Sequence, residues 1–74
     1  MKLVVPAETR QGERRVAVVP DLVSKLINLG LEVIVEAGAG EASGATDAAY
    51  IAAGAKITKK IAADLKTADI VATV

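Results

Sequence analysis

The strongest constraint on the fold is a strand, helix, strand order in the first half of the chain. Lys2–Val5 is short and rich in β-branched residues, and Pro6 ends it because proline cannot donate to a strand ladder. Pro20 then suits the first position of a helix that closes at Gly30, and residues 31–35 follow at once as a second strand. This order, with its one-residue turn, predicts a right-handed parallel crossover in which the first two strands are neighbours.

The remaining elements follow from their own signals. The helix after Pro20 carries an apolar stripe formed by Leu22, Val23, Leu26, Ile27 and Leu29. Thr46 caps a second helix that runs through Asp47, Tyr50 and Ile51 to Gly54. Residues 55–58 are expected to form a brief extended stretch, residues 59–66 a third helix, and residues 69–74 a third strand. The predicted fold class is α/β, with a parallel βαβ-type sheet of the flavodoxin or Rossmann kind.

Composition narrows the class of protein. Of the 74 residues, 53 % are hydrophobic and Tyr50 is the one aromatic residue, so we expect an aliphatic core. The nine basic and nine acidic residues cancel, which disfavours a nucleic-acid partner. No Cys or His is present, so thiolate and imidazole metal sites and the usual nucleophile pairs are excluded, and we expect no metal. The apolar runs are far shorter than the roughly 20 residues of a membrane span, and no signal peptide is expected, which favours the cytoplasm.

A glycine-rich stretch, residues 38–44, lies between a predicted strand and a predicted helix and invites comparison with a dinucleotide-binding fingerprint. Its last glycine, Gly44, comes four residues after Gly40 where the fingerprint requires three, and the helix cap lies later, at Thr46. We therefore interpret the stretch as a glycine turn at the edge of a sheet, with no cofactor-binding residue.

A dense ionic loop follows the first strand, at the edge where open parallel sheets bind ligands. Its charged members are Glu8, Arg10, Glu13, Arg14 and Arg15. Arg15 is the best candidate for binding an anion, because its planar guanidinium matches a carboxylate or a phosphate. The alternative is structural: the arginines pair with Glu8 or Glu13 and fix the loop. No pair of carboxylates has a spacing that demands acid-base chemistry, so we expect no catalytic residue in this chain.

Several segments together resemble one family. They are residues 6–20 (PAETRQGERRVAVVP), 29–30 (LG), 33–40 (VIVEAGAG), Asp47 and 53–55 (AGA). The pattern is similar to the N-terminal domain shared by alanine dehydrogenase and the α subunit of proton-translocating NAD(P) transhydrogenase, and the similarity covers essentially the whole chain. It implies that residues 1–74 are the truncated, N-terminal portion of a discontinuous domain. It also implies a Rossmann domain downstream that binds NAD(H), absent from this chain.

Two positions bear on the choice between these relatives. In alanine dehydrogenase, the resemblance implies that the Arg matching Arg15 and a Lys near the end of the last strand hold the keto-acid carboxylate. Thr73 stands at that Lys position, so a neutral hydroxyl replaces a cationic ligand. Losing a charge-assisted contact costs about 1.5 to 3 kcal/mol, which disfavours alanine dehydrogenase. The family commonly keeps the Lys in transhydrogenases also, so Thr73 departs from the pattern in either case.

The reading favoured by the resemblance is a transhydrogenase α subunit, which transfers a hydride from NADH to NADP and couples this transfer to proton translocation. It implies NAD(H) and NADP(H) in the full complex, with none bound by this segment. It also implies membrane-embedded partner subunits, a homodimer of the α subunit, and peripheral association with the inner membrane through those partners. The alternatives are an alanine dehydrogenase, in which Arg15 binds the substrate, and a stand-alone structural or interaction domain without catalysis.

Overall fold

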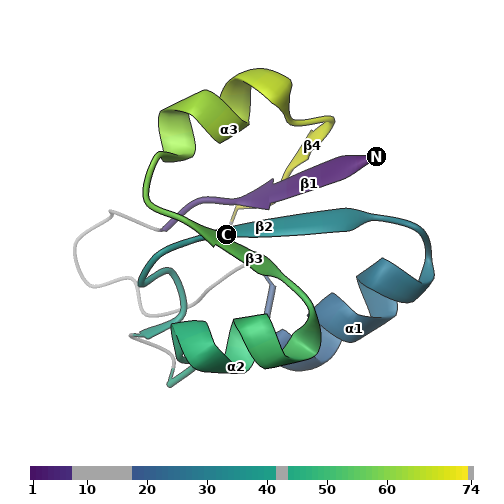
Figure 1. Ribbon diagram of the computed structural model, residues 1–74, viewed down its shortest axis with the longest axis vertical. Coiled ribbons are helices and arrows are strands. Elements are labelled where there is room, and N and C mark those ends of the chain that lie inside the picture. The colour runs from purple at the N-terminus through teal and green to yellow at the C-terminus, as the bar shows by residue number, and fades with distance from the viewer. Residues whose placement is uncertain (8–17, 42–43, 74) are drawn as a thin grey trace.

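The computed structural model describes residues 1–7, 18–41 and 44–73 (Figure 1). In these residues strands and helices alternate along the chain. The elements are β1 (Lys2–Val5), α1 (Pro20–Asn28), β2 (Glu32–Glu36), α2 (Asp47–Ala53), β3 (Lys56–Thr58), α3 (Ile61–Thr67) and β4 (Ile70–Val71).

Within the described residues, the strands form one four-stranded sheet in the order β3-β2-β1-β4, and every pairing is parallel. β1 and β2 pair from Lys2 opposite Glu32 to Val5 opposite Val35. The predicted α/β class, the parallel sheet and the adjacency of the first two strands are therefore confirmed. The helices cover both faces, with α1 and α2 on one side of the sheet and α3 on the other (Figure 1).

The extended stretch predicted at residues 55–58 is confirmed, but the predicted pattern of three strands is wrong. Residues 56–58 form β3, which pairs with β2 from Lys56 opposite Ile34 to Thr58 opposite Glu36. The final strand is therefore the fourth of the described strands, and it is only Ile70–Val71 rather than residues 69–74. Both strands lie at edges of the sheet. Each is a short segment defined by pairing with a single neighbour, and neither shows an alternation of apolar and polar residues that would predict a strand.

α1 begins and ends as its sequence predicts. Pro20 occupies the first turn, and Gly30 adopts the left-handed conformation, with φ of +93°. Only part of the predicted apolar stripe faces the sheet: Val23 is buried, whereas Leu22 and Leu29 are 38 % and 78 % exposed. Leu29 lies past the last helical residue, so the helical spacing no longer governs where it points.

The other two helices differ in how they start. The Thr46 hydroxyl accepts a hydrogen bond from the Ala49 N–H at 3.1 Å, which confirms the predicted cap of α2. α3 begins at Ile61, later than the predicted residue 59, because the Lys60 N–H donates to the Thr58 hydroxyl in the preceding turn. The two lysines therefore precede the first helical residue of α3, with Lys60 at its N-cap.

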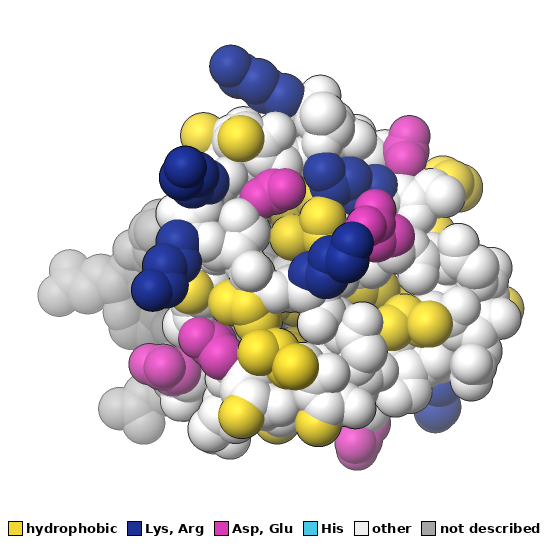
Figure 2. All heavy atoms as spheres, in the orientation of Figure 1, with side chains coloured by type: hydrophobic (Ala, Val, Ile, Leu, Met, Phe, Trp, Pro, Cys, Tyr) yellow, Lys and Arg dark blue, Asp and Glu magenta, His cyan; other side chains and the backbone are white. Residues whose placement is uncertain are grey.

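The core lies between the sheet and the α1/α2 layer. It consists of buried aliphatic residues and one aromatic ring: Leu3, Val5, Val18, Val23, Val33, Val35, Ala39, Tyr50 and Ala55. No Asp, Glu, Lys or Arg of the described residues is buried. On the face shown in Figure 2, acidic and basic side chains are interspersed among apolar ones rather than gathered into a single-sign patch.

Candidate functional site

The order of the strands creates a switch point at the carboxyl edge of the sheet. From β1 the chain moves outward to β2 and β3, whereas α3 carries it back to β4 on the other side of β1. Ligands of open parallel sheets bind outside the carboxyl ends of the strands, where the chain changes direction in this way. Here that place lies between the ends of β1 and β4, which Ala7 and Thr73 follow.

Segment 8–17 connects the carboxyl end of β1 to the region before α1. Arg15, the predicted anion-binding residue, lies outside the described residues, together with Glu8, Arg10, Glu13 and Arg14. The residues on either side of the segment, Ala7 and Val18, are described. Ala7 follows β1, and Val18 precedes α1.

Each of these two neighbours is held by a side chain from a distant region of the chain. The Ala7 N–H donates to Glu36 Oε1 at 2.7 Å, and Glu36 is the last residue of β2. The Tyr50 hydroxyl donates to the Val18 carbonyl oxygen at 2.7 Å. We call these two contacts the loop tethers. They hold Ala7 and Val18 against the body of the domain.

The Tyr50 ring is fully buried and fills the space beside the glycine turn. A Cβ placed on Gly40 would come within 2.7 Å of the ring carbon Cε2 and of the hydroxyl oxygen, so only glycine fits there without a shift. Burial raises the pKa of the Tyr50 hydroxyl, and the nearby Asp47 carboxylate raises it further. Tyr50 therefore stays protonated and able to donate at neutral pH. Its burial confirms the predicted packing of Tyr50 in the core.

In the described residues of the glycine turn, four backbone N–H groups already have acceptors within the protein. A phosphate-binding loop needs backbone N–H groups that point at the ligand. The N–H groups of Ala39, Glu41 and Gly44 donate to the backbone carbonyls of Glu36, Gly38 and Glu41, respectively. The Gly38 N–H donates to the Asp47 carboxylate at 2.9 Å, at the start of α2. These donors serve the turn, so its described residues make a structural corner.

A shallow depression of about 400 Å³ lies near the start of α1, open to solvent. It is lined by Val19, Pro20, Asp21, Gly44, Ala45 and Ala49. The one charged group among these lining residues is the Asp21 carboxylate, which repels an anionic substrate. The depression therefore does not explain binding of a keto acid or of a nucleotide.

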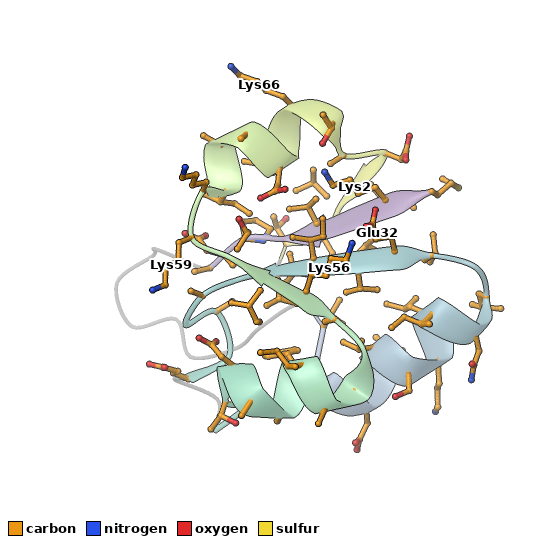
Figure 3. All side chains as sticks on the ribbon, viewed as in Figure 1. Lys2, Glu32, Lys56, Lys59 and Lys66 are labelled. Atoms are coloured by element: carbon orange, nitrogen blue, oxygen red, sulfur yellow. The ribbon has the colours of Figure 1, made fainter. Side chains whose placement is uncertain are left out.

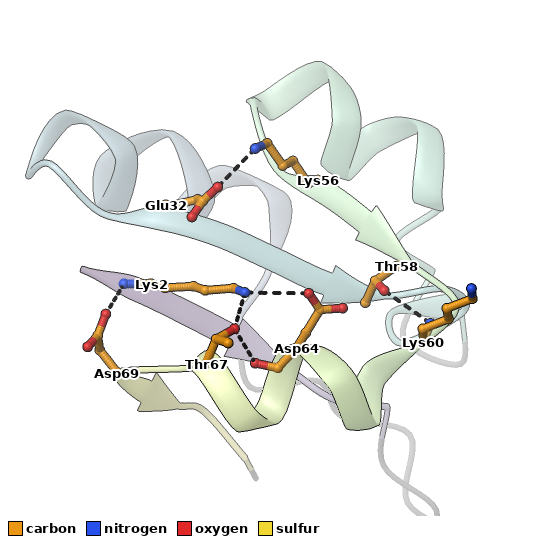
Figure 4. Close-up of polar contacts among 8 residues, drawn as sticks. All are labelled: Lys2, Glu32, Lys56, Thr58, Lys60, Asp64, Thr67 and Asp69. Carbon is orange, nitrogen blue, oxygen red and sulfur yellow. Dashed lines mark hydrogen bonds and ion pairs between the residues drawn. The ribbon is translucent and has the colours of Figure 1, made fainter.

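The opposite face of the sheet, under α3, carries polar pairs. Lys56 and Glu32 form an ion pair at 2.9 Å on the surface, and Figure 3 shows their side chains directed toward each other. The Lys2 ammonium group contacts the Thr67 hydroxyl and lies 3.5 Å from an Asp64 carboxylate oxygen (Figure 4). The Lys2 contacts hold α3 and β1 together. These polar pairs do not converge on a common point, so we find no candidate site among them.

The charged groups of the described chain are also spread too widely for a metal. No group of three or more Asp or Glu residues within the described ranges is placed to hold a metal ion. The helices there are likewise too short or too polar to cross a lipid bilayer.

Of the two positions singled out from the sequence, the structure describes Thr73, whereas Arg15 lies outside the described residues. Thr73 is exposed and follows β4 at the switch point, on the side of β1 away from β2. The sequence analysis did not identify Glu36 as a hydrogen-bond acceptor for Ala7. A carboxylate that directly follows the apolar run Val33–Val35 could have indicated a polar contact at the end of this strand. The sequence analysis also missed that Tyr50 reaches Val18. Nothing in the sequence marks a contact across 32 residues.

Comparisons with known proteins agree with this architecture. Residues 4–74 match the family model described as alanine dehydrogenase/PNT, N-terminal domain. The chain is 52 % identical, over 96 % of its length, to an NAD(P) transhydrogenase subunit alpha protein of Rhodospirillum rubrum, of which it covers 18 %. It is 47 % identical, over 77 % of its length, to an alanine dehydrogenase of Mycobacterium tuberculosis, of which it covers 15 %.

Solved structures give the same two relatives. The transhydrogenase from Sinorhizobium meliloti superposes with a TM-score of 0.88 and 42 % identity over 96 % of this chain and 21 % of that one. An L-alanine dehydrogenase superposes with a TM-score of 0.90 and 33 % identity over 99 % of this chain and 20 % of that one. The chain thus spans about one fifth, or less, of the length of these relatives. The match over residues 4–74 and the high identity show that it belongs to the alanine dehydrogenase/PNT N-terminal domain family.

Proposed function

We propose that this chain is the N-terminal portion of the α subunit of a proton-translocating NAD(P) transhydrogenase. The full complex would transfer a hydride from NADH to NADP and couple that transfer to proton movement. The observation that carries the proposal is the 52 % identity to a transhydrogenase subunit over 96 % of the chain. The match to the alanine dehydrogenase of M. tuberculosis covers 77 %.

Thr73 supports the same choice. A transhydrogenase has no keto acid to hold, so it does not need the second cationic ligand that alanine dehydrogenase places at this position. Thr73 is exposed beside the switch point and offers a neutral hydroxyl there. In this proposal Arg15 organises segment 8–17 next to the cleft between domains and binds no substrate.

The nucleotides would bind elsewhere in the full-length protein. In this proposal a Rossmann domain downstream of residue 74 holds NAD(H), and NADP(H) binds to another subunit. The glycine turn supports this division, because the N–H groups of Gly38, Ala39, Glu41 and Gly44 already donate to acceptors within the protein. Residues 1–74 would supply a portion of the neighbouring domain that borders the cleft.

The proposed assembly follows from the same relatives. The α subunit would form a homodimer and attach to membrane-embedded partner subunits, which carry the protons, on the cytoplasmic side of the inner membrane. Native mass spectrometry of the purified α subunit should give twice the mass of one chain. A mass of one chain at micromolar concentration would contradict the dimer.

The test of the main proposal is hydride transfer by the reconstituted complex. The full-length α subunit, combined with its partner subunits in vesicles, should reduce an NADP analogue with NADH and acidify one side of the membrane. Vesicles that contain the partner subunits alone are the control. Absence of hydride transfer in the complete complex would refute the proposal.

Alanine dehydrogenase is the second candidate, supported by the TM-score of 0.90 to a solved L-alanine dehydrogenase over 99 % of this chain. In this case the enzyme would deaminate L-alanine oxidatively to pyruvate with NAD. Arg15 would hold the substrate carboxylate. Arg15→Lys keeps the charge but loses the planar fork, and Arg15→Ala loses both. The KM for alanine should therefore rise in the order wild type, Arg15→Lys, Arg15→Ala. An unchanged KM in Arg15→Ala would remove Arg15 from the substrate site.

A further inference from the structure

Helix α1 carries apolar side chains on the side that faces away from α2. Its α2 side is marked by Ser24, whose hydroxyl donates to the Ala53 carbonyl oxygen at 3.2 Å. Leu22 and Leu26 are each two residues from Ser24, about 200° around the helix, so they lie on the opposite side. Leu26 packs against the core, but Leu22 is 38 % exposed. Of the other described helices, α2 lies on the far side of α1 and α3 lies across the sheet, so neither covers Leu22 (Figure 1).

β4 continues this apolar surface along the sheet. Ile70 pairs with Leu3 of β1, and the side chains of paired residues lie on the same face. Leu3 belongs to the core under α1 and α2, so Ile70 points to that face as well, where it is 36 % exposed. Ala72, two residues further on, packs against the same core. We call Leu22, Leu26, Ile70 and Ala72 the open flank.

The spacing of the layers leaves a place for one helix at the open flank. α2 packs on β3 and α1 on β2, so the side of α1 away from α2 is the side toward β1 and β4. Packed helices lie about 8 to 10 Å apart, which is about two strand spacings. Two strands beyond β2 in the sheet is β4. A helix beside α1 would therefore lie over β4.

The handedness of the crossovers shows which part of a longer chain could supply this helix. From β1 to β3 the chain moves one way across the sheet, with α1 and α2 on one face. From β3 to β4 it moves back, with α3 on the other face (Figure 1). Because parallel crossovers are right-handed, a helix that leads from β4 to a strand outside it lies on the α3 face. A helix on the open flank therefore has to come from a more distant region.

We propose that the open flank binds an amphipathic helix from a later part of the same polypeptide, after the nucleotide domain, which packs beside α1. This inference rests on the proposed function, in which residues 1–74 begin a domain that the downstream chain completes. The match to the R. rubrum subunit covers 18 % of that protein, so a chain of that size has ample sequence for such a helix. The open flank is apolar throughout, which fits the apolar stripe of a helix.

Cysteine labelling of the full-length protein tests whether the open flank is covered. Residues 1–74 contain no Cys, so single cysteines can be introduced there once any others in the full chain are replaced by serine. Leu22→Cys and Ile70→Cys report on the flank, and Ile51→Cys on α2 is the matched control. The exposed fractions of the three native side chains are 38 %, 36 % and 58 %, which by themselves would make the labelling rates differ by less than about 2-fold.

Under this proposal, both flank variants react with a maleimide at least about 10-fold more slowly than Ile51→Cys, because a covered thiol reacts only after local opening. Rates for Leu22→Cys and Ile70→Cys that equal the rate for Ile51→Cys would overturn the proposal. Each variant has to reach the wild-type thermal midpoint within a few degrees, and the two flank positions on different elements serve as checks on each other.

Photo-leucine identifies the segment that covers the flank, because it replaces leucine without a large change of size. After irradiation of the full-length protein, mass spectrometry should find Leu22 or Leu26 joined to a peptide that follows the nucleotide domain. Mixing isotopically labelled and unlabelled subunits distinguishes a link within one chain from a link between two copies. A flank joined only to the nucleotide domain, only to a second copy or partner subunit, or to nothing would overturn the proposal.

Neither experiment depends on hydride transfer, so the two proposals can fail separately. If the complete complex transfers no hydride but the flank is covered by the later segment, the transhydrogenase assignment fails and the docking of the helix stands. If hydride transfer is normal but Leu22→Cys and Ile70→Cys react as fast as Ile51→Cys, only the docking of the helix fails.

Discussion

The two faces of the sheet are built in different ways. On the α1/α2 face, the inward residues of β1 and β2 join a continuous apolar core that encloses Tyr50. On the α3 face, Val4 and Ile34 are buried, but they lie between polar residues such as Lys2 and Glu32, and α3 itself contains no buried residue. Parallel sheets are usually covered by apolar layers on both sides. Within the described residues, the α1/α2 layer therefore supplies most of the apolar burial, and the α3 layer relies more on polar contacts.

A valine-to-alanine substitution, made once on each side of this contrast, should produce the greatest difference in stability. Val35 is fully buried in β2, whereas Val71 is 48 % exposed in the edge strand β4. Val35→Ala should lower the free energy of unfolding by about 2 to 3 kcal/mol through lost burial and a cavity, and Val71→Ala by less than about 1 kcal/mol. Urea denaturation of the purified full-length protein measures both. An equal loss in the two variants would mean that other regions of the protein cover β4 as fully as the core covers β2.

A second test concerns the tight packing on the α1/α2 face. Gly40→Ala would place a Cβ 2.7 Å from the Tyr50 ring and 2.8 Å from the Ala45 Cβ, so it should cost about 1 to 3 kcal/mol by overpacking. In a Tyr50→Leu background the cost should fall but not vanish, because Ala45 remains. A double-mutant cycle by urea denaturation gives the coupling. Strictly additive effects would contradict the contact between Gly40 and Tyr50.

On the α3 face the polar contacts should matter less. Lys2→Met removes the contacts to Asp64 and Thr67; the Lys2 and Asp64 side chains are largely but not completely covered, so the loss should cost about 0.5 to 1 kcal/mol. Lys66→Met, in the exposed last turn of α3, is the matched control and should change the unfolding free energy by less than about 0.5 kcal/mol. A loss above about 2 kcal/mol for Lys2→Met would show that this face is held as firmly as the core.

The smallest effect is the pH dependence of the Glu32 and Lys56 pair. The hydrogen bond to Lys56, and its charge, lower the pKa of Glu32 from 4.5, and the reciprocal contacts raise the pKa of Lys56 from 10.5. The stabilisation is therefore complete between these two ordinary values. It is lost as the pH falls through the lowered pKa of Glu32 or rises through the raised pKa of Lys56. Lys56→Met should remove this dependence. The measurement is the thermal midpoint of unfolding as a function of pH, compared between the variant and the wild type. Identical profiles would show that the pair contributes nothing.

The sequence predicted those features of the fold that depend on local signals. Pro20, Gly30, Thr46 and Gly54 each determine one helix end through backbone geometry or a cap, and the structure confirms all four. β3 and the true length of β4 were not predictable in this way, because edge strands are defined by their pairing partners. The tethers at Glu36 and Tyr50 escaped prediction for the same reason: they join segments that only the finished fold brings together.

The central position of β1 has a consequence for synthesis on the ribosome. β1 is made before the other strands and can pair with β2 once Glu36 has left the ribosomal tunnel, but its other edge pairs with β4, which leaves the tunnel only with Val71. At translation rates of about 5 to 20 residues per second, adding residues 37–71 takes roughly 2 to 7 seconds. During this time the nascent chain presents an apolar strand with one unpaired edge, the kind of surface that chaperones bind and that neighbouring nascent chains can join.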